Sequence, residues 1–222
     1  MKNRLIILLL TITCGILVSV ITLDIYAKSD EISTKTENIS KNENILFLGD
    51  SIFDWYPTEK IFDDLPIVNS GICGNKTTDI LENIEDRVYK YNPTKVFINI
   101  GTNDIEYNDS DELNQEVVNN IIKITQEIQK NRQKCKIYVI SIYPVNNNLS
   151  GAGNRHNSEI QDINAKLREY CANSGTIEYI DAYSQLIGDN GLLHEEYTKD
   201  GLHLSDLGYA KLTEILMKYI YQ

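Results

Sequence analysis

The sequence is poor in residues that bind metals or build disulfide frameworks. Its 222 residues include four cysteines and three histidines. Three of the cysteines, Cys73, Cys135 and Cys171, follow an N-terminal apolar segment, and no two of them have metal-ligand spacing. Their odd number excludes a fully paired framework, although a Cys135–Cys171 bridge in an oxidising compartment stays open. We expect small buried residues instead.

Positive charge is also scarce. Lys and Arg number 21 against 32 Asp and Glu, a formal net charge of −11. Residues 1–27 hold Lys2, Arg4 and Asp24, a net charge of +1, which leaves −12 on the rest of the chain. So acidic a body argues against nucleic acid or an anionic lipid surface as the principal partner. Internal repeats and low-complexity segments are absent too, and the length suits one α/β domain of ordinary size.

Residues 1–27 have the pattern of a membrane anchor or a signal peptide. Lys2 and Arg4 precede an uncharged apolar run from Leu5 to Leu23. That run has about the length of a membrane-spanning helix, and its basic flank places the N-terminus on the cytoplasmic side. Because the run exceeds the usual apolar core of a signal peptide, we favour an uncleaved anchor.

Two alternatives to an uncleaved anchor remain. Ala27 offers a small residue at which a signal peptidase could cut, and Cys14 could carry a lipid, although the residues before it match that signal poorly. All three possibilities place the rest of the chain outside the cytoplasm, in contact with the membrane only through this segment. Residues 28–43 are polar and alternate in charge, which predicts a flexible linker.

Residues 44–222 alternate apolar runs with helical patterns. Continuous apolar runs are typical of parallel strands covered on both faces, and they lie at Ile45–Leu48, Pro66–Val68, Lys95–Ile100, Lys136–Ile142 and Thr176–Ile180. Amphipathic helices follow candidate N-caps at Thr77 or Thr78, Ser110 or Asp111, Ser158, and Ser205. This order predicts a three-layer α/β/α sandwich with a five-stranded parallel sheet. Residues 146–157 are the expected mobile loop near the site.

Polar residues follow several of these strands. Ser51 comes just after the first strand, Gly74 after the second and Asn103 after the third, while Asp200 and His203 come after the fifth. The carboxyl ends of parallel strands meet at one edge of the sheet, where functional groups gather. We therefore expect these five residues to converge.

Three of the converging residues have the chemistry of a nucleophile, a base and an acid. A serine hydroxyl needs a base to take its proton, and histidine titrates in the useful range. His203 is the candidate base for Ser51, and Asp200, three residues earlier, can orient its ring and stabilise the imidazolium. The other histidines, His156 and His194, lack a comparable partner and are expected to be loop residues.

The tetrahedral intermediate of acyl transfer also needs hydrogen-bond donors, each worth about 3 kcal/mol of barrier. The backbone N–H groups of Ser51 and Gly74 and the side-chain amide of Asn103 are the candidates for this oxyanion hole. Gly71 also fits the place of the glycine donor loosely. We choose Gly74 because it immediately precedes the polar segment that starts at Asn75.

Four stretches, taken together and in order, resemble the blocks of the SGNH (GDSL-type) hydrolase family. They are Gly49-Asp50-Ser51-Ile52, Gly74-Asn75, Gly101-Thr102-Asn103-Asp104 and Asp200-x-x-His203. The resemblance covers roughly residues 44–222 and is far more specific than any single motif. The Gly-x-Ser-x-Gly elbow of general α/β-hydrolases is absent.

The resemblance implies a flavodoxin-like hydrolase fold, hydrolysis of acyl esters and no metal cofactor. By position it puts the nucleophile on Ser51, the oxyanion donors on Ser51, Gly74 and Asn103, and the acid and base on Asp200 and His203. It also implies short acyl esters as substrates, O-acetyl groups on cell-surface polysaccharide among them. A lysophospholipase, a thioesterase, an O-acyltransferase and a non-catalytic carbohydrate-binding module are the alternatives. Trp55 and Tyr56 could stack on a sugar ring, but with fourteen tyrosines in the chain chance placement is the better explanation.

Overall fold

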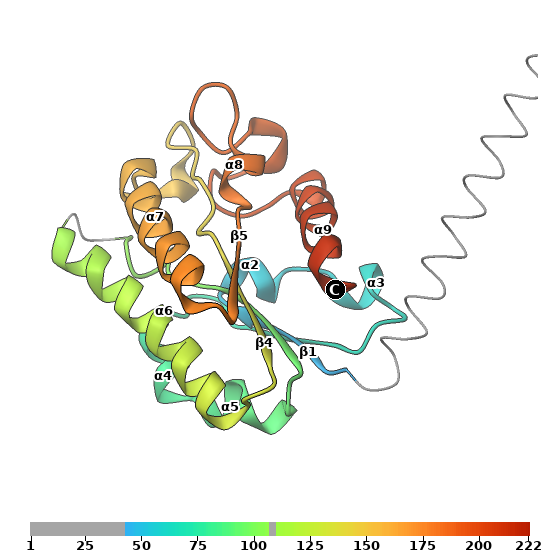
Figure 1. Cartoon of the computed structure of the whole chain (residues 1–222). Coiled ribbons are helices and arrows are strands. Elements are labelled where there is room, and N and C mark those ends of the chain that lie inside the picture. The colour runs from blue at the N-terminus through green and yellow to red at the C-terminus, as the bar shows by residue number, and fades with distance from the viewer. Residues whose placement is uncertain (1–42, 107–109) are drawn as a thin grey trace, which may run out of the picture. The chain divides into compact units, whose positions relative to one another are not determined.

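The computed structural model describes residues 43–106 and 110–222 (Figure 1). The expected anchor, residues 1–27, and nearly all of the expected linker lie outside the described residues, so the division of the chain into anchor, linker and domain stays a prediction. Within the two described ranges, no helix is both long and apolar enough to cross a membrane.

The centre of the fold is one five-stranded parallel sheet in the order β2-β1-β3-β4-β5. Its strands are β1 (Ile45–Gly49), β2 (Ile67–Gly71), β3 (Lys95–Asn99), β4 (Lys136–Ile140) and β5 (Ile177–Ile180). Gly49 at the end of β1 is level with Gly71 of β2 and Asn99 of β3. The loops after these three strands therefore start side by side, as the sequence predicts.

Helices cover both faces of the sheet, which confirms the predicted three-layer sandwich (Figure 1). The longer ones are α6 (Asp111–Asn131), α7 (Asn157–Ser174) and α9 (Asp206–Ile220). The shorter ones are α2 (Ser51–Asp54), α3 (Thr58–Ile61), α4 (Thr77–Glu82), α5 (Ile84–Arg87) and α8 (Tyr183–Leu186), with single 3₁₀ turns at Tyr89–Tyr91, Ser150–Ala152 and Glu195–Tyr197.

The two faces of the sheet carry different side chains because neighbouring strand residues point to opposite sides. The face under α4 to α7 is aliphatic and includes Leu46, Leu48, Val96, Ile98, Ile137 and Val139. The other face is aromatic: the ring of Phe47 stacks on Phe53 of α2 at 5.0 Å between centroids, and Phe97 stacks on Tyr138 at 4.6 Å. Because both faces of the sheet are buried, its strands appear in the sequence as unbroken apolar runs.

Helix boundaries differ from the prediction in two places. The helix expected after Thr77 or Thr78 is divided into α4 and α5 at Asn83, whose side-chain amide donates to the carbonyl of Asp79 at 2.9 Å and competes with helical bonding. The cap residue of α4 is Lys76, and that of α7 is His156 rather than Ser158. Ser110 caps α6 as predicted, since its Oγ accepts the N–H of Leu113 at 3.3 Å.

Cys135 and Cys171 are buried free thiols, so they do not form the alternative disulfide. Burial raises the pKa of the Cys135 thiol to about 12 and that of Cys171 to about 11. The expectation of burial is wrong for Cys73, which is an exposed free thiol.

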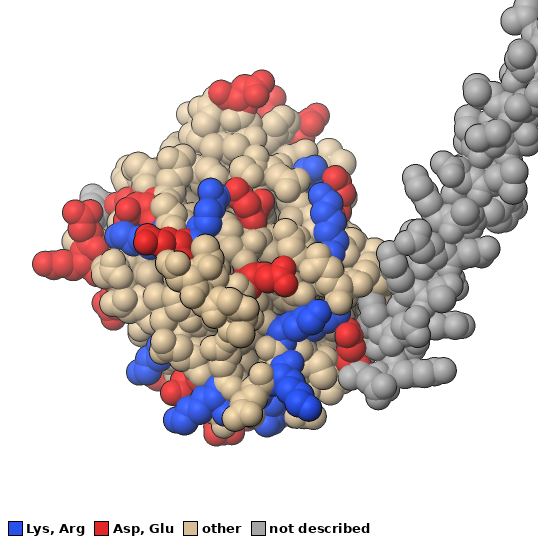
Figure 2. Space-filling model, in the orientation of Figure 1, with Lys and Arg blue, Asp and Glu red and all other residues tan. Residues whose placement is uncertain are grey.

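Charged side chains are unevenly spread over the face in Figure 2, with Asp and Glu toward the top and left of the view and Lys and Arg mostly toward the bottom.

Candidate active site

Ser51 stands where β1 ends and α2 begins. Asp50 is the cap residue of α2, and its Oδ1 accepts the N–H of Ile52 at 3.0 Å. This bond turns the chain sharply and holds Ser51, which is 3% exposed, as the first helical residue. The backbone N–H at the start of a helix has no intrahelical acceptor, so that of Ser51 is available to a ligand.

Ser51, His203 and Asp200 lie in one hydrogen-bonded row. Ser51 Oγ is 3.0 Å from His203 Nε2, and His203 Nδ1 is 2.7 Å from Asp200 Oδ2. An ionised carboxylate only accepts hydrogen bonds, so Nδ1 carries the ring proton and donates it to Asp200. Nε2 of the neutral ring is therefore the acceptor that faces the hydroxyl of Ser51.

The carboxylate of Asp200 is fixed by its own backbone neighbours. Its Oδ1 accepts the N–H groups of Leu202 at 2.9 Å and His203 at 2.8 Å. Partial burial opposes ionisation, but the hydrogen bonds from the side chain of His203 and from these two amides outweigh it and hold the pKa of Asp200 below its usual value. The arrangement keeps a negative charge beside the imidazole.

Trp55 contacts the same imidazole from its face. The rings of Trp55 and His203 stack at 4.1 Å between centroids, and Trp55 remains 51% exposed. The sequence marks Trp55 only as a ring available to a sugar and gives no sign of this contact. Tyr56 is not available to a sugar, because it is 2% exposed, stacks on Tyr209 in the core and shares a hydrogen bond with Thr213 Oγ1.

The structure separates the two glycines that fit the second block. The N–H of Gly71 donates to Asn69 Oδ1 at 2.9 Å, and a Cβ on Gly71 would lie 2.2 Å from the backbone nitrogen of Asp54. Gly71 therefore serves the packing of β2 against α2. Gly74 has a φ of +78° on an exposed turn, with nothing within 4 Å of a Cβ position. Among the described residues, no acceptor takes its N–H.

Asn103 lies next to the turn that contains Gly74. Its Nδ2 donates to the carbonyl oxygen of Asn75 at 3.0 Å, which leaves the second N–H of the amide for another acceptor. Asp104, to which the sequence assigns no chemistry, accepts from the backbone N–H and the hydroxyl of Thr77. It thereby joins the loop after β3 to the start of α4.

The two other histidines lie apart from this row. His156 is the cap residue of α7, and His194 Nδ1 accepts the N–H of Glu196 at 3.3 Å.

Asp50, directly before Ser51, is fully buried. Burial and the nearby Asp104 raise the pKa of its carboxyl to about 7, against the opposing effects of the Ile52 N–H and the Arg155 guanidinium.

The segment expected to be a mobile loop, residues 146–157, is held at several points. The N–H of Asn146 donates to Gly201 O at 2.8 Å, and the N–H of Gly151 donates to Asp200 O at 2.8 Å. Arg155 is buried and hydrogen-bonds to the loop that carries Asn103. A run of Asn, Gly and Ser gives no sign of these tertiary contacts, so the sequence misses Arg155.

Comparisons with known proteins find a family and several solved structures to which this chain is similar. The model of the GDSL-like Lipase/Acylhydrolase family matches residues 47–211. A solved protein from Streptococcus pneumonia that is named a platelet activating factor is 33% identical, covers 93% of this chain and 99% of its own, and superposes with a TM-score of 0.75. The acetyl xylan esterase AlAXEase is 20% identical, with coverage of 79% and 98% and a TM-score of 0.65, and shares the fold.

A longer relative is the N-acylneuraminate cytidylyltransferase of Escherichia coli O18:K1:H7, which is 32% identical over 192 residues. The match includes 86% of this chain but only 43% of that protein, so this chain corresponds to less than half of the relative. The family match, by contrast, extends over most of the described fold and includes the stretches with Ser51, Asn103 and His203. The chain therefore belongs to the GDSL-like lipase/acylhydrolase family and is a carboxylic ester hydrolase.

Proposed function

We propose that this chain is an extracytoplasmic serine esterase that hydrolyses short acyl esters, such as O-acetyl groups on cell-surface polysaccharide. The observation that carries the proposal is the row from Ser51 Oγ to His203 Nε2 at 3.0 Å and from His203 Nδ1 to Asp200 Oδ2 at 2.7 Å. Each distance is within hydrogen-bond range, as nucleophile, base and acid require.

The reaction starts with proton transfer from Ser51 to His203. Oγ attacks the ester carbonyl while Nε2 takes the hydroxyl proton, and Asp200 stabilises the imidazolium that forms. The carbonyl oxygen becomes an oxyanion and accepts hydrogen bonds from the amides of Ser51 and Gly74 and from Asn103 Nδ2. The imidazolium returns its proton to the departing alcohol, which leaves an acyl group on Ser51.

Water completes the cycle. His203 takes a proton from water as the water oxygen attacks the acyl-enzyme, and the same donors hold the second oxyanion. Collapse of this intermediate releases the carboxylic acid and returns the proton to Ser51. An O-acyltransferase would differ only at this step, where the hydroxyl of an acceptor takes the place of water.

Three observations support the choice of substrate and of location. The half-exposed ring of Trp55 lies against His203 and offers a flat apolar surface to a ring-shaped alcohol portion. A related fold belongs to a protein named an acetyl xylan esterase. The basic flank and apolar run before Asp24 support export of the domain.

A matched pair of serine variants tests the proposal. Release of 4-nitrophenol from 4-nitrophenyl acetate, butyrate and octanoate is followed with the full-length chain in mild detergent, with Ser51→Ala and with the control Ser184→Ala. We expect Ser51→Ala to lose about 10⁴-fold or more in kcat and the exposed Ser184→Ala to match the parent. Acetate should be the best substrate.

The other outcomes separate the alternatives. Preference for octanoate would favour a lysophospholipase or a thioesterase. Acyl transfer to an added sugar, faster than hydrolysis, would favour an acyltransferase. Equal activity in the parent and Ser51→Ala, or no activity in either, would refute a serine esterase.

A further inference from the structure

We propose that Arg155 is a positioning residue, which fixes the side-chain amide of Asn103 in the orientation that an oxyanion donor needs. The inference rests on the proposed function and goes beyond it, because Arg155 itself does not touch the reacting atoms. A continuous set of hydrogen bonds connects buried guanidinium groups with the polar loops after β2 and β3.

Arg155 lies in the segment between β4 and α7 and is 1% exposed. Its Nε donates to the carbonyl oxygen of Thr102 at 2.7 Å, and its Nη2 donates to Asn103 Oδ1 at 3.1 Å. Nη1 donates to Ala152 O at 3.2 Å, and Glu106 Oε2 lies 3.4 Å from Nη2. One planar group therefore holds two consecutive residues of the loop after β3.

The bond to Asn103 decides which way its amide faces. A guanidinium group has donors and no acceptor, so only the oxygen of the amide can lie against it. The NH₂ group of Asn103 must then face the other way, where Nδ2 donates to Asn75 O at 3.0 Å. A flipped amide would set NH₂ against a cation and lose both bonds. The guanidinium also polarises the amide, which strengthens it as a donor.

A second buried arginine, Arg87, binds the side chain of Asn75, the residue whose carbonyl oxygen accepts from Asn103. Arg87 Nη1 donates to Asn75 Oδ1, and Arg87 Nη2 donates to the carbonyl oxygens of Gly49 at the end of β1 and Ser70 in β2. The row Arg87–Asn75–Asn103–Arg155 thus connects the ends of β1 and β2 with the segment before α7. Asn75 directly follows Gly74, so the backbone and the side-chain oxyanion donors are set by one network.

The segment with Arg155 also contacts the acid. Gly151 lies four residues before Arg155, and its N–H donates to the carbonyl oxygen of Asp200 at 2.8 Å. A Cβ on Gly151 would lie 2.7 Å from that same oxygen, so the approach is close. One segment therefore supports both Asn103 and Asp200, which gives a reason for a buried cation just before α7 despite its cost of desolvation.

The test is a double-mutant cycle on ester hydrolysis. The full-length parent, Arg155→Met, Asn103→Ala and the double variant are compared for kcat and KM with 4-nitrophenyl acetate. We expect Asn103→Ala to lower kcat about 10²-fold. Arg155→Met should lower kcat by about 10- to 10²-fold, the cost of a misplaced group, with little change in KM. In the Asn103→Ala background, Arg155→Met should cost less than about 3-fold more, because it acts through Asn103.

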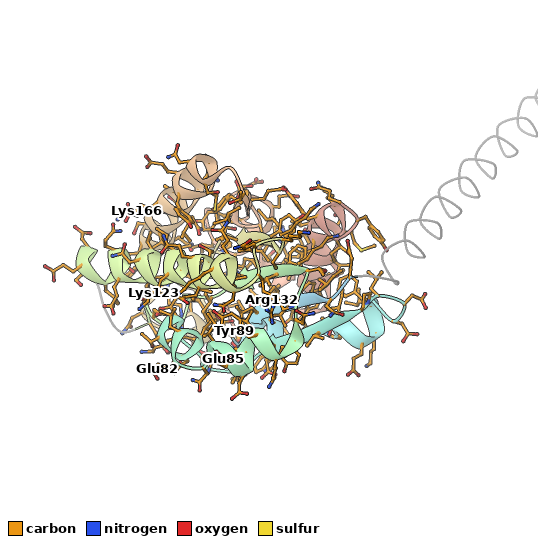
Figure 3. The ribbon with its side chains drawn as sticks, turned by 60° about the horizontal axis from the view of Figure 1, so that its bottom comes forward. Glu82, Glu85, Tyr89, Lys123, Arg132 and Lys166 are labelled. Atoms are coloured by element: carbon orange, nitrogen blue, oxygen red, sulfur yellow. The ribbon has the colours of Figure 1, made fainter. Side chains whose placement is uncertain are left out.

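Two further variants keep the test sharp. Arg155→Lys retains the buried charge but cannot form the two-pronged contact with Thr102 O and Asn103 Oδ1, so we expect it to fold and still to lose about 10-fold in kcat. Arg132→Met is the control. Arg132 lies at the end of α6, its Nη2 donates to the carbonyl oxygen of Tyr89 at 3.2 Å, and the two side chains lie close together in Figure 3. It should leave kcat unchanged.

Failure of the inference differs from failure of the proposed function. Losses that multiply fully in the double variant, or an Arg155→Lys variant with the kcat of the parent, would overturn the positioning role. A parent without esterase activity, or an Asn103→Ala variant as fast as the parent, would instead overturn the oxyanion assignment on which the inference depends.

Discussion

Replacement of Asp200 with asparagine isolates the role of its charge in orienting His203. Oδ1 of Asp200 accepts two backbone N–H groups, and Oδ2 accepts Nδ1–H of His203 at 2.7 Å. An asparagine keeps the first oxygen but presents NH₂ to Nδ1. The ring proton must then move to Nε2, which would donate to Ser51 Oγ rather than accept its proton.

The expected loss follows from that change of tautomer. A wrongly protonated base lowers kcat by about 10⁴-fold in comparable triads, which is about 5 kcal/mol of barrier. The free energy of unfolding should fall by only about 1 kcal/mol, because the two backbone bonds survive and one hydrogen bond to the ring is lost. Activity and stability should therefore separate in Asp200→Asn.

The assay measures kcat with 4-nitrophenyl acetate and the midpoint of urea unfolding. Asp189→Asn is the matched control, since Asp189 is an exposed carboxylate before the same final helix. A folded Asp200→Asn protein that keeps kcat within about 10-fold of the parent would refute the orienting role, because a wrongly protonated imidazole would cause a far larger loss.

Three further changes give expected outcomes. Trp55→Ala should lower kcat roughly 3- to 10-fold by freeing the imidazole of the proposed base, with Trp55→Phe close to the parent; equal kcat in all three would contradict this. Gly71→Ala places a Cβ 2.2 Å from Asp54 N and should lower the free energy of unfolding by about 3 kcal/mol, against about 1 kcal/mol for Gly74→Ala, and reversed costs would show that the two roles are exchanged. Because the pKa of Asp50 is about 7, the folded state keeps a proton that the unfolded state loses, so the free energy of unfolding should fall by up to about 4 kcal/mol as the pH rises from about 4 to about 7. Asp50→Asn should remove that decline. Parallel curves of stability against pH for the parent and the variant would exclude this effect.

The sheet could be predicted because its strands are buried on both faces and therefore read as apolar runs. β2 is the exception: the prediction ends at Val68, while the strand continues through Asn69 and Ser70 to Gly71. These polar residues look like a loop in the sequence. In the structure, Ser70 Oγ and Arg87 Nε are 3.1 Å apart, so the side chain is satisfied within the fold.

The candidate site divides in the same way. Ser51, Asp200 and His203 could be picked out because each follows a strand or precedes a helix in a recognisable local pattern. Arg155 could not, because an isolated arginine among Asn, Gly and Ser looks like a solvated surface residue. Its burial depends on acceptors in a loop about fifty residues earlier, and no local pattern encodes that contact.

Covalent labelling tests most directly whether Ser51 is a nucleophile that His203 activates. A fluorophosphonate probe reacts with the full-length chain, and mass spectrometry then gives the number of labels and the labelled peptide. We predict one label per chain, on Ser51, with none on Ser51→Ala and labelling slowed about 10²-fold or more in His203→Ala. Labelling of Ser51→Ala at the rate of the parent, or of Ser51 at an unchanged rate in His203→Ala, would contradict it.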